Sequence, residues 1–498
     1  MVSFSFFLLF YHKIRPDATK KCSALHIPGI FAILGNHRKH YTEAEMEMLR
    51  KHLTTTQIIT LSFLFVILIG SLLLAAPFAS ADGTATPFLD AMFTATSCVC
   101  VTGLVTVTTA SHWSLFGHIV ILLLIQIGGL GVIAITTVFT MLLGKKLSLS
   151  SRMLLGDAFN LETMQGLVRF LRKVIVGTFL VEGIGAALYL PVFVSEYGPK
   201  GVWYAVFHAV SAFCNAGIDL LGPDSLIPYV HDIWINVVTM SLIIVSGLGF
   251  IVWFDFLEAS KKKLRKETRR SIWALLSLHS KIVFVMTASL LVIGAVLYFV
   301  FEYHNPATIG SFHPAQKALA ACFQSVTTRT AGFVTIPQKG LTTPSVIVTL
   351  FLMFTGGSPV GTAGGVKTTT LAIIFLAVIA TIRGREDIIC FRRRISAKTA
   401  RKALSVVLIS FFASVAAIII LMIFEPGAAS DQIFEVYSAL GTVGISRDYT
   451  SVIGAAGKII LCICMFLGRI GPISMVLVFT IRDRQIAARL PEEHVAVG

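Results

Sequence analysis

The chain has 498 residues, of which 55% are hydrophobic and 13% charged, and its mean hydropathy is +0.82. Soluble domains carry about 25% charged residues, so the composition excludes an ordinary soluble domain and indicates a membrane protein with several spans. The formal net charge of +15 could suit nucleic acid, but the basic residues gather in loops between apolar runs, so we expect no nucleic-acid partner.

The first 56 residues are expected to form a cytoplasmic N-terminal extension before the first span. Its opening, "MVSFSFFLLF", lacks the basic start and the small-residue cleavage site of a signal peptide. The eight cysteines of the chain lie mostly in apolar stretches, where cysteine behaves as a small hydrophobic residue. We therefore expect neither a disulfide framework nor a zinc site.

Four short segments resemble one another, and each contains a small or polar pair followed by a glycine: "TSCVCVTGL" (96–104), "SAFCNAGID" (211–219), "SVTTRTAGF" (325–333) and "SALGTVGIS" (438–446). Their last glycines are separated by 114, 115 and 112 residues: Gly103, Gly217, Gly332 and Gly444. A near-constant period in a membrane chain indicates internal duplication.

Each period contains the same order of segments. A long apolar span comes first and is followed by a run of 10 to 13 residues, at 88–98, 202–213, 314–326 and 431–440. These runs are too short to cross a bilayer, which takes ~20 helical residues, so we expect half-helices. The glycine motif and a second long span follow. The sequence predicts an all-α polytopic membrane protein with four tandem helix–pore-half-helix–helix repeats, eight spans in all, around one pseudo-fourfold pore.

The predicted boundaries place repeat one at 57–143, repeat two at 144–257, repeat three at 258–382, and repeat four with the C-terminal tail at 383–498. Of the 41 Lys and Arg residues, 33 lie in the N-terminal extension, the segments that join the repeats and the tail. The positive-inside rule puts these segments and both termini in the cytoplasm. We therefore expect a multi-pass protein of the cytoplasmic membrane, with the glycine motifs facing outward.

The outer segments carry an excess of acids. They hold six bases, among which we count Arg329, and eleven acids: Asp82, Asp90, Glu196, Asp219, Asp224, Asp232, Glu302, Glu425, Asp431, Glu435 and Asp448. An acidic mouth would concentrate cations, although any single acid could equally serve to solvate a loop.

The glycine motifs suit a cation filter. Non-helical backbone at membrane depth is tolerated only where it is buried in protein or lines water. Four such segments can meet around one axis, where their carbonyl oxygens replace the hydration shell of a cation, and glycine permits the dihedral angles that turn carbonyls inward. The half-helices direct their negative ends at the motifs. The candidate filter residues are Val101, Thr102, Gly103, Asn215, Ala216, Gly217, Thr330, Ala331, Gly332, Thr442, Val443 and Gly444.

Six motifs carry a family resemblance: "TATSCVCVTGL", "FCNAGID", "TRTAGF", "GTVGIS", "GGSPVGTAGGVKTTT" and "GRIGP". They resemble signatures of the superfamily of potassium transporters, which includes the membrane subunits of bacterial Ktr and Trk systems and the plant HKT proteins. The similarity begins near Gln57, and eight spans without an added N-terminal pair resemble the Ktr subunit most. The resemblance implies K⁺ as the transported ion. Some plant relatives with serine at the first filter glycine favour Na⁺, so glycine at all four positions implies a preference for K⁺.

The resemblance also implies an assembly. Family members form homodimers in which each subunit has its own pore, and these sit on a ring of cytosolic nucleotide-binding regulatory subunits. We expect no nucleotide on this chain itself, because it has no G-x-x-x-x-G-K-[ST] loop between a strand and a helix. The basic loops at 261–270 and 392–402 are open to membrane lipids or to the regulatory subunit.

The second span of repeat three, at about 344–382, is nearly twice as long as a crossing requires. It contains "GGSPVGTAGG" (356–365), where proline removes a helical hydrogen bond and the glycines have poor helix propensity. We expect a gate loop beneath the filter, flanked by two helices. The candidate gate residues are Gly356, Gly357, Ser358, Pro359, Gly361, Thr362, Ala363, Gly364, Gly365, Lys367 and Arg469.

Lys367 and Arg469 are the two bases that we place within the membrane, where an ionisable residue is a functional hypothesis by default. Arg469 would raise an electrostatic barrier below the filter, as does the arginine that the family places at its constriction. The alternative is an ion pair with a buried acid such as Glu182. For Lys367, contact with the gate and snorkelling to the cytoplasmic interface are equally open.

The other second spans also contain glycine clusters: "QIGGLGV" (126–132), "SGLGFI" (246–251) and "LGRIGP" (467–472). Close helix packing is a sufficient explanation for these three.

Two alternatives remain for the function. A sodium-selective or poorly selective transporter of the same fold would keep its K⁺/Na⁺ preference when Gly103 is replaced by serine. An integral-membrane transferase would need acids or histidines clustered at one membrane face, whereas the histidines here are scattered. We therefore expect a transporter and not an enzyme.

Overall fold

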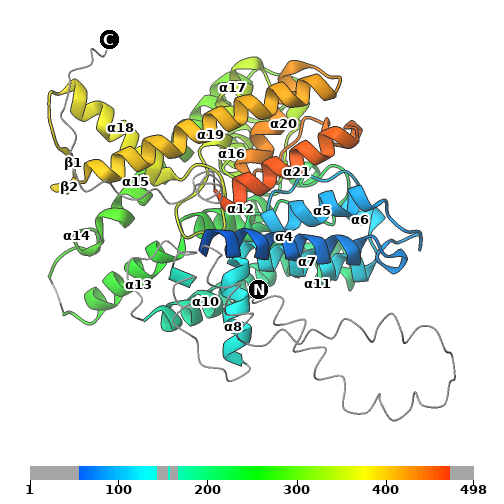
Figure 1. Cartoon of the computed structure of the whole chain (residues 1–498), viewed down its shortest axis with the longest axis horizontal. Coiled ribbons are helices and arrows are strands. Elements are labelled where there is room, and N and C mark those ends of the chain that lie inside the picture. Colours follow the sequence, from blue (N-terminus) through cyan, green and yellow to red (C-terminus); the bar gives the residue numbers. More distant parts are fainter. Residues whose placement is uncertain (1–54, 143–154, 157–165, 268, 472–498) are drawn as a thin grey trace, which may run out of the picture.

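The computed structural model describes residues 55–142, 155–156, 166–267 and 269–471. Almost all of the predicted N-terminal extension, and the tail beyond Gly471, lie outside the described residues. Within them the chain is largely helical, as Figure 1 shows.

Four long helices are apolar enough to cross a membrane: α4 (Thr55–Leu74), α10 (Leu167–Tyr197), α15 (Leu278–Glu302) and α19 (Ala397–Phe424). Each corresponds to the first span of a predicted repeat. Many of their large apolar side chains point away from the protein, which a bilayer tolerates and water does not. In α19 only 11% of the most apolar stretch is buried, against 28–39% in the other three. The long helices therefore form the periphery.

A short helix follows each long one: α5 (Phe88–Cys100), α11 (Lys200–Cys214), α16 (Pro314–Thr327) and α20 (Ala429–Gly441). Their bounds differ from the predicted half-helices by no more than two residues at either end. Each packs against the long helix of its own repeat. Their C-terminal halves are almost entirely buried, so the glycine motifs that follow begin in the interior.

The second span is interrupted in repeats one, two and three, whereas we expected an interruption in repeat three alone. Repeat one has α7 (Leu115–Leu130) and α8 (Val132–Leu142), repeat two has α12 (Ile233–Gly247) and α13 (Phe250–Leu264), and repeat three has α17 (Thr343–Phe354) and α18 (Thr368–Ile382). The bend between α12 and α13 is 94°. In repeat four, α21 (Ala455–Ile470) ends at Gly471.

Close packing is therefore only half of the explanation for the glycine clusters. It holds for Gly129, where an added Cβ would lie 2.5 Å from Cys214 Sγ. However, Gly131, Gly249 and Gly471 have φ values of 88°, 86° and 92°, which a residue with a side chain adopts only at a cost. Gly131 and Gly249 each lie between two helices of one span, and Gly471 follows the end of α21. Our expectation of uninterrupted second spans was therefore wrong for repeats one and two, and the continuation of the span in repeat four lies outside the described residues.

One small element departs from the all-α prediction. Strands β1 (Ile388–Cys390) and β2 (Arg393–Ile395) form an antiparallel hairpin, with Ile388 opposite Ile395. Its two turn residues, Phe391 and Arg392, both have positive φ, as a tight hairpin turn requires. The hairpin lies with α13, α14 (Ile272–Leu275) and α18 at one end of the molecule, on the left in Figure 1.

The helices close into a ring. The short helix of each repeat packs against the second-span helix of the preceding repeat, in the pairs α11 with α7, α16 with α12, α20 with α17, and α5 with α21. The last pair joins repeat one to repeat four, so that α5 and α21 lie together in Figure 1. The largest core cluster spans this junction and includes Phe93, Leu461 and Met465.

Candidate functional site

The four glycine motifs share one backbone conformation. The first and last residues of each predicted filter triplet have positive φ, although the first is never glycine. The values are 55° and 101° for Val101 and Gly103, 60° and 64° for Asn215 and Gly217, 69° and 88° for Thr330 and Gly332, and 50° and 90° for Thr442 and Gly444. A left-handed residue with a side chain costs of order 1 kcal/mol. Four equivalent cases indicate that the fold imposes this conformation, which turns successive carbonyls toward one side.

The ends of the half-helices set this geometry. In repeat one, Val101 N–H donates to Cys98 O (3.1 Å) and Thr102 N–H donates to Ser97 O (2.8 Å). This pair of bonds is the Schellman motif, which requires a left-handed residue after the helix. Repeats two and four contain the same pair of bonds. Repeat three differs, because Ala331 N–H donates to Thr327 O instead (3.0 Å).

Hydroxyl groups from the half-helices support the glycine loops. Gly103 N–H donates to Ser97 Oγ (3.0 Å), and Gly444 N–H donates to Ser438 Oγ (3.1 Å). In the other two repeats, the Ser211 and Thr327 hydroxyls donate at 2.6 Å to carbonyls just after the filter glycine. All four hydroxyls are buried, and they fix each glycine loop to the half-helix that precedes it.

The four loops meet in a closed cycle. A Cβ added to any filter glycine would collide with the middle carbonyl of the next repeat's triplet. Gly217 would meet Ala331 O at 2.5 Å, Gly332 would meet Val443 O at 2.8 Å, Gly444 would meet Thr102 O, and Gly103 would meet Ala216 O. Segments more than 100 residues apart thus surround one axis, which is the arrangement that the pore hypothesis requires.

A polar cavity of about 450 Å³ opens at one end of this ring. All four filter glycines line it, together with Asp219, Asp224, Asp448 and Lys339. Because three acids face one base, the cavity favours a cation.

The acidic mouth is smaller than the sequence suggested. Only three of the eleven outer acids line the cavity. Several others are structural: Asp90 pairs with Lys458 (2.6 Å), Asp431 pairs with Arg447 (3.0 Å), Asp232 caps α12, and Glu302, Glu425 and Glu435 accept hydrogen bonds.

The predicted gate loop lies at the opposite end of the ring. The cavity is lined by the last residue of each triplet, whereas the loop contacts first residues. Asn215 Nδ2 lies 3.3 Å from Thr362 Oγ1, and a Cβ on Gly364 would collide with the side chain of Thr442. The loop therefore passes directly against filter residues of repeats two and four.

Backbone hydrogen bonds hold the loop. Gly356 N–H donates to Val366 O (2.9 Å), which brings the two ends of the loop together. Ser358 N–H donates to Gly247 O (3.0 Å), and Phe250 N–H donates to Val360 O (2.9 Å). The interruption between α12 and α13 thus leaves backbone groups free to bind the loop.

Arg469 joins the loop to repeat one. Its guanidinium donates to Thr362 O in the loop and to Gly128 O in α7, with Gly129 O at 3.3 Å. The alternative of an ion pair with Glu182 was wrong, because Glu182 accepts from Gln126 Nε2 at 3.0 and 3.3 Å and from the Cys214 thiol.

Lys367 is half-buried, and its ammonium donates to Ala363 O at 2.6 Å. This contact lies within the loop segment, which favours the gate interpretation of Lys367 over snorkelling to the interface.

Sequence reasoning missed Arg329, which we counted among the outer bases. It is only 8% exposed, and its guanidinium lies 3.4 Å from Gly356 O at the start of the loop. The position immediately after a half-helix was the available signal, because such a helix ends within the membrane and not at its surface.

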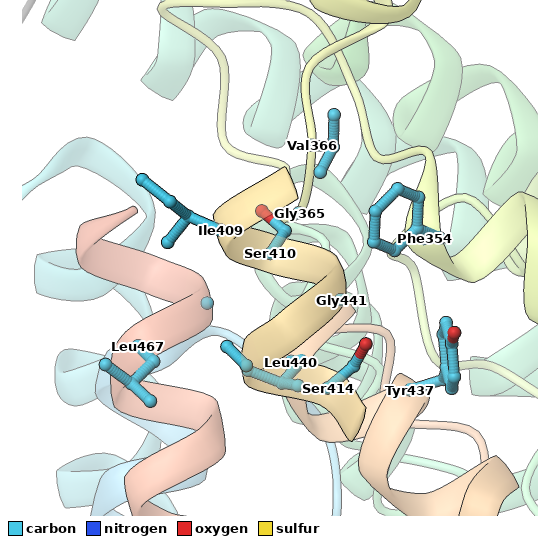
Figure 2. A pocket seen from close by; sticks show the side chains of 12 residues that line it. Phe354, Gly365, Val366, Ile409, Ser410, Ser414, Tyr437, Leu440, Gly441 and Leu467 are labelled. Atoms are coloured by element: carbon cyan, nitrogen blue, oxygen red, sulfur yellow. The ribbon is translucent and has the colours of Figure 1, made fainter. Parts of the chain in front are cut away.

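An apolar pocket of about 190 Å³ flanks the loop (Figure 2). The pocket is lined on the side of the loop by Gly365 and Val366. Its other walls include Ile409 and Ser414 of α19, Leu440 of α20 and Leu467 of α21. The loop therefore has unfilled volume beside it.

Comparison with known proteins identifies the family of the chain. The family model described as TrkH, cation transport protein, matches residues 22–487. The chain is 38% identical to the potassium/sodium uptake protein NtpJ of Enterococcus hirae, over 90% of this chain and 98% of that one. It is 37% identical to the Ktr system potassium uptake protein B of Bacillus subtilis, over 89% and 97%.

The fold also matches a solved structure, the potassium transporter TrkH from Vibrio parahaemolyticus, with a TM-score of 0.64 at 16% identity over 84% of each chain. The family model and the two relatives each cover most of the chain. This protein therefore belongs to the TrkH family of cation transport proteins.

Proposed function

We propose that this protein takes up K⁺ through the ring formed by its four glycine motifs. The observation that carries the proposal is the closed cycle of contacts, in which each filter glycine lies against the middle carbonyl of the next repeat. Carbonyl oxygens held around one axis can replace the water of a partly dehydrated cation. The polar, acidic cavity at one end supplies cations to the ring.

Selectivity for K⁺ over Na⁺ is supported by glycine at all four filter positions and by the names of the relatives. Transport of both ions is the second candidate, which the E. hirae relative, a potassium/sodium uptake protein, favours. A transferase activity is not retained, since the family consists of cation transport proteins.

The loop at 356–365, together with Arg469, serves as the gate. It lies against the first filter residues of two repeats, and Arg469 fixes it to a third. A cation leaving the filter would meet this backbone and the positive charge of Arg469. The apolar pocket beside Gly365 gives the loop space into which it can move.

The assembly follows the family and the names of its members. The relative from B. subtilis is named as part of a Ktr system, which supports association of this chain with other subunits; the homodimer on a cytosolic nucleotide-binding ring is the assembly that the family resemblance implies. The concentration of basic residues in the loops between repeats supports cytoplasmic termini in the cytoplasmic membrane. The same loops suit contact with anionic lipids or with the ring.

The test is a flux measurement in proteoliposomes. We expect the purified protein to pass K⁺ in preference to Na⁺. Removal of residues 356–365 should raise K⁺ flux and leave the K⁺/Na⁺ ratio unchanged, because the filter lies outside the deleted segment. Absence of K⁺ and Na⁺ flux under every condition, with the partner subunits included, would refute transport. Loss of flux on deletion would make the loop a structural hinge.

A further inference from the structure

Arg329 lies inside the protein and has no acidic partner among the described residues. It follows the half-helix α16 and immediately precedes Thr330, the first filter residue of repeat three. Its side chain is 8% exposed, and it forms no ion pair with any described carboxylate. A guanidinium taken out of water needs hydrogen-bond acceptors close by, so the contacts of Arg329 decide its role.

The hydrogen-bond contact of the Arg329 side chain is with the gate loop. The guanidinium lies 3.4 Å from Gly356 O, the first carbonyl of the loop. Arg329 also lines a cavity of about 20 Å³ with Gly247, Thr287 and Gly357. Among the described residues, neither Arg329 Nε nor the Thr287 hydroxyl has a hydrogen-bond partner. The loop is therefore the hydrogen-bond partner of Arg329, and the two have room to shift.

Three cationic side chains hold three carbonyls of one loop. Arg329 donates to Gly356 O, Arg469 to Thr362 O and Lys367 to Ala363 O. These carbonyls lie at the beginning and in the second half of the segment. Arg469 acts on the second half of the loop, whereas in the first half Arg329 adds a side-chain hydrogen bond to the backbone bonds that Gly356 and Ser358 already make.

We propose that Arg329 is a positioning residue of the gate, which holds Gly356 against the third half-helix and so keeps the start of the loop closed. The proposal rests on the gate role of the loop. Because Arg329 is adjacent to Thr330, it also connects the filter of repeat three to the loop.

The test compares K⁺ flux in proteoliposomes of the full-length protein carrying Arg329→Gln, Arg329→Lys, the 356–365 deletion, or the deletion with Arg329→Gln. We expect Arg329→Gln to raise flux about tenfold, the effect of losing a hydrogen bond to a charged group. Arg329→Lys should raise it by less than half as much, since it keeps the charge without the planar fork. In the deletion background, Arg329→Gln should add nothing, because Gly356 is gone.

Arg383→Gln is the matched control, since Arg383 is exposed beyond the end of α18, and its flux should equal that of the wild type. A general loss of packing would not make the effect of Arg329 depend on the loop.

The two proposals fail differently. If the deletion leaves flux unchanged, the gate itself is refuted, and Arg329 with it. If the deletion raises flux but Arg329→Gln does not, or if Arg329→Gln changes the K⁺/Na⁺ ratio in the deletion background, only the positioning role is overturned. Should Arg329→Gln not fold, Arg329→Lys decides. The deletion is then combined with Arg329→Lys: an increase in flux by Arg329→Lys that vanishes in the deletion background supports the role, and unchanged flux overturns it.

Discussion

The hydrogen-bond acceptors of the Arg469 guanidinium are backbone carbonyls and not carboxylates. Two of them belong to separate repeats, so one side chain from α21 connects the gate loop to the end of α7. The bond to Thr362 O exists only while the loop lies beneath the filter. Arg469 can therefore both repel cations below the filter and hold the gate loop against α7.

Replacing Arg469 by glutamine should raise K⁺ flux about tenfold or more, because hydrogen bonds from a charged group are worth about 1.5–3 kcal/mol. Arg469→Lys should give an intermediate flux, since the positive charge remains while the planar set of guanidinium N–H donors is lost. Flux in proteoliposomes checks this, with the K⁺/Na⁺ ratio measured alongside. Equal flux in wild type and Arg469→Gln would show that Arg469 neither blocks nor latches.

At the scale of the element, the unpaired backbone N–H and C=O groups at the ends of each span need hydrogen-bond partners within or near the membrane. Glu302, at the end of α15, is fully buried, and its carboxylate caps the start of α17. It accepts from Thr342 N–H (2.9 Å), Thr342 Oγ1 (2.7 Å) and Thr308 Oγ1 (2.6 Å). Glu425 serves α21 in the same way, through Gly454 N–H (3.0 Å) and Gly457 N–H (2.8 Å). These two acids are helix caps donated by a neighbouring helix.

Glu302→Gln should therefore lower the free energy of unfolding by about 2 kcal/mol, since it turns charge-assisted hydrogen bonds into neutral ones at a buried cap. Thermal denaturation of the purified protein in detergent measures this. Glu258→Gln is the control, because Glu258 pairs with Lys262 on an exposed surface, where ion pairs contribute little. Equal melting temperatures for the two variants would contradict the capping role of Glu302.

The half-helices and the interruption in repeat three were predictable, whereas the interruptions of the second spans in repeats one and two were not. A run of 10 to 13 residues before a glycine motif is too short to span a bilayer, so the length of the run alone predicts a half-helix. By contrast, Gly129 and Gly131 are indistinguishable in the sequence. One lies against Cys214, and the other adopts a positive φ that ends a helix. Only the neighbours of a glycine tell these roles apart. The hairpin at 388–395 was missed because three-residue strands leave no periodicity.

At the scale of the molecule, the ring of four repeats is closed by contacts between repeat one and repeat four. Lys458 of α21 pairs with Asp90 of α5 at 2.6 Å, and both side chains are largely buried. The 112–115-residue period predicted that four equivalent loops exist. It could not show which charges face the axis. Asp90, Arg329 and Glu302 were assigned to the mouth, whereas each forms an internal contact that joins distant segments.

The central claim is that the four loops act as one filter, and the most direct test replaces each filter glycine by serine in turn. A Cβ at any of the four positions would collide with the middle carbonyl of the next loop. Gly198→Ser is the matched control, because Gly198 also has positive φ (60°) but no neighbour within 4 Å. We predict that K⁺/Na⁺ flux ratios in proteoliposomes fall for Gly103→Ser, Gly217→Ser, Gly332→Ser and Gly444→Ser and stay unchanged for Gly198→Ser. Wild-type ratios in all four filter variants would contradict the claim.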